Sequence, residues 1–152
     1  MTNTFDDITC PVSPQRVNEN VVRTVAVFVL MIATLSLYLN LYVLSAFLAV
    51  DFAIRAFTDG RASLLKNISK YLVQVLKIGE RPIDAAPKKF AAGVGALFSI
   101  SISLLQIFHF PYAAYAVGGI LFICAFLEGF VGFCVGCVIY SYGILAILNK
   151  IK

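Results

Sequence analysis

Residues 24–57 read TVAVFVLMIATLSLYLNLYVLSAFLAVDFAIRAF, an almost unbroken apolar run. The run is roughly twice as long as the ~17 residues that a short membrane-spanning helix needs, so a single helix would overshoot the bilayer. It is interrupted by the polar break Tyr38-Leu-Asn40-Leu-Tyr42, whose aromatic side chains are of the kind that prefers the membrane interface. The sequence therefore predicts a helical hairpin, with helices over about residues 23–39 and 41–57.

The composition of the whole chain also requires an apolar surrounding. Of its 152 residues 61% are hydrophobic, and the mean hydropathy is +0.91, whereas ordinary soluble domains are about half apolar. A soluble fold of this length has too little interior to hide that surface, so we expect an integral membrane protein. The net charge of +4 does not indicate nucleic-acid binding, because the basic residues lie in loops beside apolar runs, as in the positive-inside pattern.

The rest of the chain extends this hairpin into one integral-membrane domain. We expect a cytoplasmic N-terminal segment at 1–23, hairpin 1 at 24–57, a basic cytoplasmic loop at 58–89, hairpin 2 at 90–133 and a cytoplasmic end at 134–152. Within the loop, residues 61–78 have apolar side chains at helical spacing and lysines elsewhere, which is typical of an amphipathic helix lying on a membrane surface. The predicted fold is all-α, with four short transmembrane helices in two hairpins, a cytoplasmic interfacial amphipathic helix and both termini in the cytoplasm.

The apolar character from residue 113 to residue 148 is too long for one span. We expect a break at Gly132–Gly136, followed by a short helix at the inner surface. Lys150 and Lys152 then agree with a cytoplasmic C-terminus. In the competing topology, 113–148 is a second tight hairpin with the basic tail outside, which breaks the charge rule.

The cysteines are the most reactive groups in the chain. Cys134 and Cys137 form a C-x-x-C, a spacing that at a helix N-terminus lowers a thiol pKa and allows a reversible disulfide. Cys10 is expected on the same cytoplasmic side, where it could serve as an auxiliary thiol. Cys124 is interpreted as a small packing residue. Redox or sulfur chemistry, simple packing among glycines and a metal site remain alternatives, although thiolate zinc sites usually need four ligands.

Several charged side chains lie close to the predicted membrane surface. Asp51 and Arg55 are four residues apart, so they share a helix face and can form an ion pair. Glu128 is a candidate for proton transfer, but we expect it to pair with Arg55 or with a basic residue of the N-terminal segment, because an unpaired carboxylate at membrane depth is costly. A polar cluster expected just before the bilayer consists of Arg16, Asn18, Glu19, Asn20 and Arg23.

Four motifs in this order resemble a bacterial integral-membrane family known as domain of unknown function 4395. They are Cys10-Pro-Val-Ser-Pro-Gln-Arg-Val-Asn-Glu-Asn-Val-Val-Arg23, Asp51-Phe52…Arg55-Ala-Phe57, Asp84-Ala-Ala-Pro-Lys88…Phe90-Ala-Ala92 and Leu127-Glu128…Phe133-Cys-Val-Gly-Cys137-x-x-Tyr140. The resemblance covers nearly the whole chain and implies a small four-span protein of the bacterial inner membrane, sometimes associated with thioredoxin-like or sulfurtransferase proteins.

The leading functional hypothesis is thiol–disulfide or sulfane-sulfur exchange at the cytoplasmic membrane face. Cys134 and Cys137 would be the reactive pair, and the partner a thioredoxin-like or rhodanese-like protein. The alternative is a non-catalytic scaffold or accessory subunit, either as a homo-oligomer or in a larger membrane complex. A small transporter is the third reading, and the absence of a polar path through the membrane argues against it.

Overall fold

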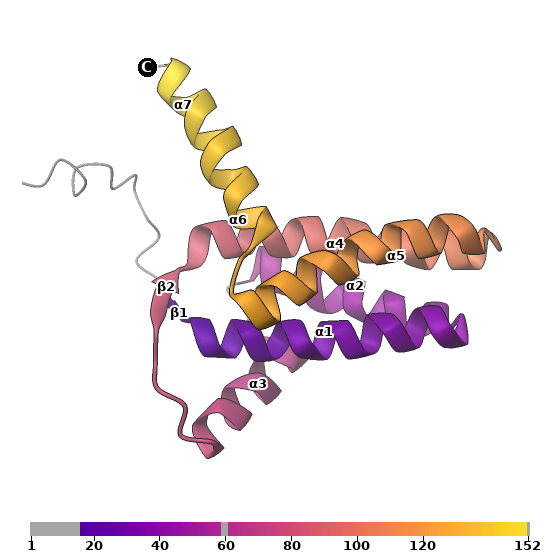
Figure 1. The fold of residues 1–152 in the computed structure, drawn as a ribbon, viewed down its shortest axis with the longest axis horizontal. Coiled ribbons are helices and arrows are strands. Elements are labelled where there is room, and N and C mark those ends of the chain that lie inside the picture. Colours follow the sequence, from indigo (N-terminus) through magenta and orange to yellow (C-terminus); the bar gives the residue numbers. More distant parts are fainter. Residues whose placement is uncertain (1–15, 59–60, 152) are drawn as a thin grey trace, which may run out of the picture.

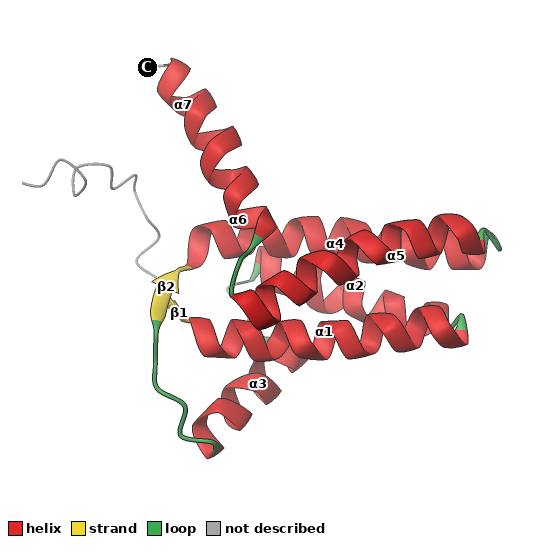
Figure 2. Ribbon diagram, viewed as in Figure 1, coloured by secondary structure: helices red, strands yellow, loops and turns green. Residues whose placement is uncertain are grey.

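The computed structural model describes residues 16–58 and 61–151, and this part of the chain is mostly helical (Figure 2). Its long helices are α1 (Glu19–Leu39), α2 (Tyr42–Phe57), α3 (Leu64–Val75), α4 (Ala85–Ile107) and α5 (Pro111–Phe126). The π-helical turn η2 (Leu127–Val131) continues α5, and α6 (Val135–Ile139), η3 (Tyr140–Ile144) and α7 (Leu145–Ile151) follow one another. Two short strands, β1 (Arg16–Asn18) and β2 (Pro82–Asp84), complete the fold.

The helices α1, α2, α4 and α5 form a bundle that lies horizontally in Figure 1. Within it α2 packs along α4, α4 against α5, and α5 against α1. We call the end where β1 leads into α1 and β2 into α4 the strand end. The opposite end, with the turns at Asn40 and at residues 108–110, is the turn end. In Figure 1 α3 and α7 project from the strand end in opposite directions, across the bundle axis.

Three helical segments are long and apolar enough to cross a membrane, namely Glu19–Leu39, Ala85–Ile107 and Pro111–Val131. Large apolar side chains on their outer faces are exposed, for example Met31, Leu97 and Ile123. A chain in water would bury such side chains, whereas a bilayer covers them without cost. The architecture is therefore that of an all-α membrane protein. The remaining bundle helix, α2, has 16 residues.

Local sequence explains where the helices begin and end. Asn18 caps α1 by accepting a hydrogen bond from the backbone N–H of Asn20. The same helix ends at Leu39, and its C-cap residue Asn40 adopts φ 51°, a left-handed conformation that asparagine tolerates better than most residues. The turn thus falls within the predicted break at residues 38–42. Pro111 opens α5, where its missing N–H is of no consequence.

The start of α4 differs from the sequence prediction. We expected the basic loop to extend to residue 89 and hairpin 2 to begin at residue 90, but α4 begins at Ala85 and contains Pro87. The prediction was wrong because Pro87 lies in the first turn, where a backbone N–H has no partner within the helix and its loss costs little.

The turn end is held together by Gln106, a residue that the sequence analysis did not single out. Its side chain is only 4% exposed. Its amide nitrogen donates to the backbone carbonyl of Ser36 at 3.0 Å, and the hydroxyl of Ser45 donates to its amide oxygen at 2.8 Å. One side chain of α4 therefore joins the ends of α1 and α2.

Replacing Gln106 by Ala should lower the free energy of unfolding by about 1–3 kcal/mol, because the polar groups of Ser36 and Ser45 would stay buried without this partner. The measurement is equilibrium unfolding in detergent. Ser101→Ala is the control, since the Ser101 side chain is exposed and bonds only within its own helix at Leu97; it should change stability by less than about 0.5 kcal/mol. Equal effects of the two variants would contradict this role of Gln106.

Candidate functional site

Three distant parts of the chain meet at the strand end: the start of α1, the start of α4, and the residues that follow α5 (Figure 1). The strands set this arrangement. They pair antiparallel with Arg16 opposite Asp84 and Asn18 opposite Pro82. Because each strand runs directly into a helix, their pairing fixes the starts of α1 and α4 beside each other.

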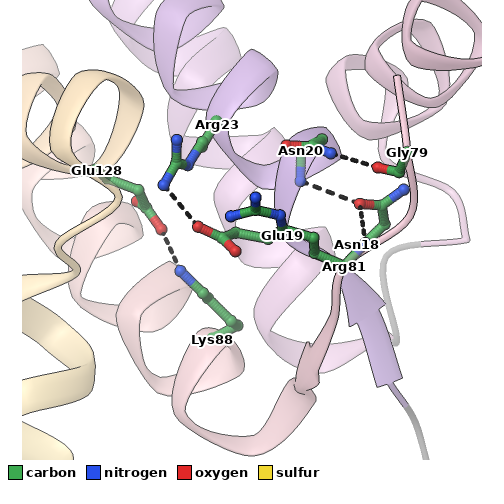
Figure 3. Close-up of polar contacts among 8 residues, drawn as sticks. All are labelled: Asn18, Glu19, Asn20, Arg23, Gly79, Arg81, Lys88 and Glu128. Atoms are coloured by element: carbon green, nitrogen blue, oxygen red, sulfur yellow. Dashed lines mark hydrogen bonds and ion pairs between the residues drawn. The ribbon is translucent and has the colours of Figure 1, made fainter. Parts of the chain in front are cut away.

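Hydrogen bonds around Asn18 reinforce the strand pairing (Figure 3). The side-chain oxygen of Asn18 accepts from the backbone N–H groups of Asn20 and Arg81, at 3.0 and 3.3 Å. The backbone N–H of Glu19 donates to the carbonyl of Arg81 at 2.8 Å, and the Asn20 side chain donates to the carbonyl of Gly79. These members of the predicted polar cluster therefore join the start of α1 to the loop before α4.

Two ion pairs lie beside these hydrogen bonds (Figure 3). Glu19 and Arg23 pair within α1 at 2.7 Å, and Lys88 of α4 pairs with Glu128 of η2 at 2.7 Å. We had expected Glu128 to pair with Arg55 or with the N-terminal segment, and this prediction was wrong. Lys88 is the partner because α4 starts three residues earlier than this lysine and presents it toward η2.

A third ion pair lies on α2 and ties it to α3. Asp51 is 3% exposed and lies 3.0 Å from the guanidinium of Arg55. The other carboxylate oxygen accepts from the hydroxyl of Ser63 at 2.8 Å and from the backbone N–H of Leu65 at 3.3 Å. Asp51 therefore binds the first turn of α3 as well as Arg55. The guanidinium also lies over the ring of Phe52, 4.4 Å from its centroid.

The cysteine pair follows a sharp reversal of the chain. Helical structure stops at Val131, and Gly132 adopts φ 76°, a left-handed conformation. A side chain there would also collide with the guanidinium of Arg23, so the reversal packs directly on α1. Cys134 then occupies the N-cap position of α6 and Cys137 lies within its first turn. The break falls inside the predicted interval Gly132–Gly136.

Helix α6 lies close against α4. A Cβ atom on Gly136 would come within 2.7 Å of the Ala91 side chain, so only glycine allows this approach. The contact holds the cysteine pair near the start of α4 and near Lys88. Cys134 is buried, at 9% exposure, and Cys137 is half-buried.

The two thiols are electrostatically unequal. Cys134, Cys137 and Cys124 are all free thiols. A hydrogen bond from the Cys137 side chain lowers the pKa of Cys134, with a further contribution from the nearby ammonium of Lys88, while burial and Glu128 oppose the shift. The same hydrogen bond, together with burial, raises the pKa of Cys137. Of the two thiols, Cys134 is the one whose pKa is lowered and which lies near the positive charge of Lys88.

The other candidate thiols lie elsewhere. Cys124 is half-buried on α5, in line with a packing role. Cys10 lies outside the described residues. Within residues 16–58 and 61–151, no three side chains of His, Cys, Asp or Glu gather closely enough to hold a metal ion.

Residues 17–144 match a protein family described as a domain of unknown function (DUF4395). The chain belongs to this family. No curated protein and no solved structure matches it. The matched region contains β2, all of β1 except its first residue, the whole bundle and the C-x-x-C pair, so these are parts of the family's common domain.

Sequence reasoning found the charged residues at the strand end but missed two of their partners. Ser63 is the N-cap residue of α3. Its only signal in the sequence was a serine just before an expected helix, which favours an N-cap but does not indicate a contact with Asp51. Lys88 was placed in the basic loop at 58–89, so its helical orientation toward Glu128 could not be inferred. The pairing of β1 with β2 joins segments of three residues each, which carry no recognisable strand pattern.

Replacing Lys88 by Gln removes the cation that favours the Cys134 thiolate, so the pKa of Cys134 should rise. Because the thiolate is the reacting form, iodoacetamide should alkylate Cys134 about threefold to tenfold more slowly at pH 7, and the rate should recover at higher pH. Site-resolved mass spectrometry measures the rate. The control is Lys150→Gln, which removes the same charge from an exposed lysine on α7. An unchanged pH profile in Lys88→Gln would show that Lys88 does not act on Cys134.

Proposed function

We propose that this protein exchanges disulfides with a dithiol protein at the cytoplasmic face of the bacterial inner membrane, through Cys134 and Cys137. The observation that carries the proposal is the placement of two free thiols at the N-cap and in the first turn of α6, next to Lys88. A thioredoxin-like partner has the required dithiol chemistry.

The unequal exposure and acidity of the two sulfurs suit a definite reaction order. A thiolate of the partner attacks the more exposed sulfur, Cys137, of the Cys134–Cys137 disulfide. Cys134 leaves as a thiolate beside the ammonium of Lys88, which favours its charged form. The partner's second thiolate then attacks the sulfur of the partner's first cysteine, which is bonded to Cys137 in the mixed disulfide. This releases Cys137, which takes up a proton. The partner ends as a disulfide and the cysteine pair as a dithiol, so two electrons have moved.

The same thiolate suits sulfane-sulfur transfer from a rhodanese-like partner. Cys134 would attack the outer sulfur of the partner's persulfide, and the partner cysteine would leave as a thiolate. Cys134 would then carry the persulfide. Intact mass spectrometry separates the two reactions, because only this one adds a sulfur atom to the chain. Cys10 stays a proposed auxiliary thiol in either reaction.

We further propose that α2 is a fourth span and that the strand end faces the cytoplasm. Two features support this topology. The turn end, residues 36–46 and 104–115, contains no Asp, Glu, Lys or Arg, while the strand end is rich in basic residues. At the strand end α3 has an apolar face and lysines, as an interfacial helix has. Both termini would then be cytoplasmic.

Thiol counting tests the redox proposal. The reduced protein, equilibrated with glutathione at graded ratios of oxidised to reduced form, is alkylated and weighed intact. Wild type should lose two alkylated thiols at oxidising ratios. Cys124→Ser should lose the same two, whereas Cys134→Ser and Cys137→Ser should not form the bond. Full alkylation of wild type at every ratio would overturn the proposal.

A non-catalytic scaffold is the second candidate. It is favoured by the low exposure of Cys134 and by the Lys88–Glu128 ion pair, which connects α4 to η2 at the strand end. In this case the strand end would present a docking surface to a larger membrane complex or to a second copy. Failure of the thiols to oxidise at any glutathione ratio would leave this function as the better one.

A further inference from the structure

A cavity of about 350 Å³ opens at the strand end, among α1, α2 and α4. One part of its wall is apolar, formed by Val21, Val25 and Val29 of α1, Phe52 of α2 and Ala92 of α4. The exchange chemistry proposed above does not use this space. Its volume suits a polar head group with the first atoms of a chain, at the low end of the range for ligand pockets.

The rest of the lining is strongly basic. Six basic side chains line the cavity, and Glu128 is the acidic residue among them. They are Arg16, Arg55, Arg61, Lys66, Lys88 and Lys89. Glu128 already pairs with Lys88, so the wall as a whole favours an anion.

Arg55 supplies the most specific observation in favour of a bound anion. Its Nε faces Asp51, but its Nη2 is buried and has no hydrogen-bond partner among the described residues. A buried guanidinium N–H without an acceptor costs free energy, and a planar guanidinium matches the oxygens of a phosphate. The unpartnered atom belongs to a residue that lines the cavity.

We propose that this cavity binds the phosphate of an anionic phospholipid. Arg55 and Arg61 hold the phosphate, and the start of the acyl region lies along Val25, Val29 and Phe52. A free phosphate would use the cations but would leave this apolar wall exposed to water. Basic pockets between membrane helices on the cytoplasmic side are suited to anionic head groups. The proposal does not depend on the thiol reaction.

The test is thermal unfolding of the full chain in a neutral detergent, with phosphatidylglycerol, phosphatidylcholine or inorganic phosphate added. Phosphatidylglycerol at about a hundredfold excess over its dissociation constant should raise Tm by roughly 5–10 °C. The other two additives should leave it nearly unchanged. An equal rise with phosphatidylcholine, or with phosphate alone, would overturn the proposal in favour of an apolar site or of a small-anion site.

Variants locate the binding. Arg61→Gln should weaken the apparent affinity for phosphatidylglycerol about fivefold, and Arg55→Gln should weaken it about tenfold or more. Lys150→Gln, remote from the cavity lining, should bind as wild type does. Because Arg55→Gln also leaves Asp51 without its cation, Arg61→Gln, an exposed position, decides the matter if Arg55→Gln fails to fold. Unchanged affinity in Arg61→Gln would place the lipid elsewhere and contradict the proposal.

Discussion

The structure depends on one constraint, that charges next to a membrane interior must have partners. Among the described residues of the strand end, three carboxylates form ion pairs: Glu19 with Arg23, Asp51 with Arg55, and Glu128 with Lys88. Removing one member would leave a poorly solvated charge, which is far more costly than the pair is stabilising. Two of these pairs reach beyond one helix, since Glu128 ties η2 to α4 and Asp51 also binds the start of α3. Electrostatic pairing therefore joins η2 to α4 and α2 to α3, while the strand pairing joins the starts of α1 and α4.

The same pairing links the thiols to the cavity. Lys88 lines the cavity, pairs with Glu128 and favours the thiolate of Cys134. An anion bound near Lys88 would offset part of that positive charge. The two proposed activities thus share one residue, although each rests on its own observations. The exposed apolar faces of the long helices are those expected of a membrane protein.

Much of the fold was predictable because it follows from local pattern. The helical character, the turn at Asn40 and the break after Val131 come from apolar periodicity, aromatic residues and glycine, and they were placed to within a few residues. The features that could not be predicted are tertiary contacts. The partner of Glu128, the bonds of Ser63 and the role of Gln106 each depend on helix orientation across 12 or more residues of sequence, and a single sequence does not encode that orientation in its periodicity.

The most direct test of this arrangement is a disulfide between α1 and η2. A Cβ atom on Gly129 would lie 3.6 Å from that of Ala26, within the range that a disulfide bridges. In a chain whose four native cysteines are replaced by serine, Ala26→Cys with Gly129→Cys should crosslink readily on oxidation. Ala26→Cys with Gly119→Cys should not, since nothing lies within 4 Å of a Cβ at Gly119. A chain that crosslinks only in the second pairing, or in neither, would contradict the contact that brings the cysteine pair to the start of the bundle.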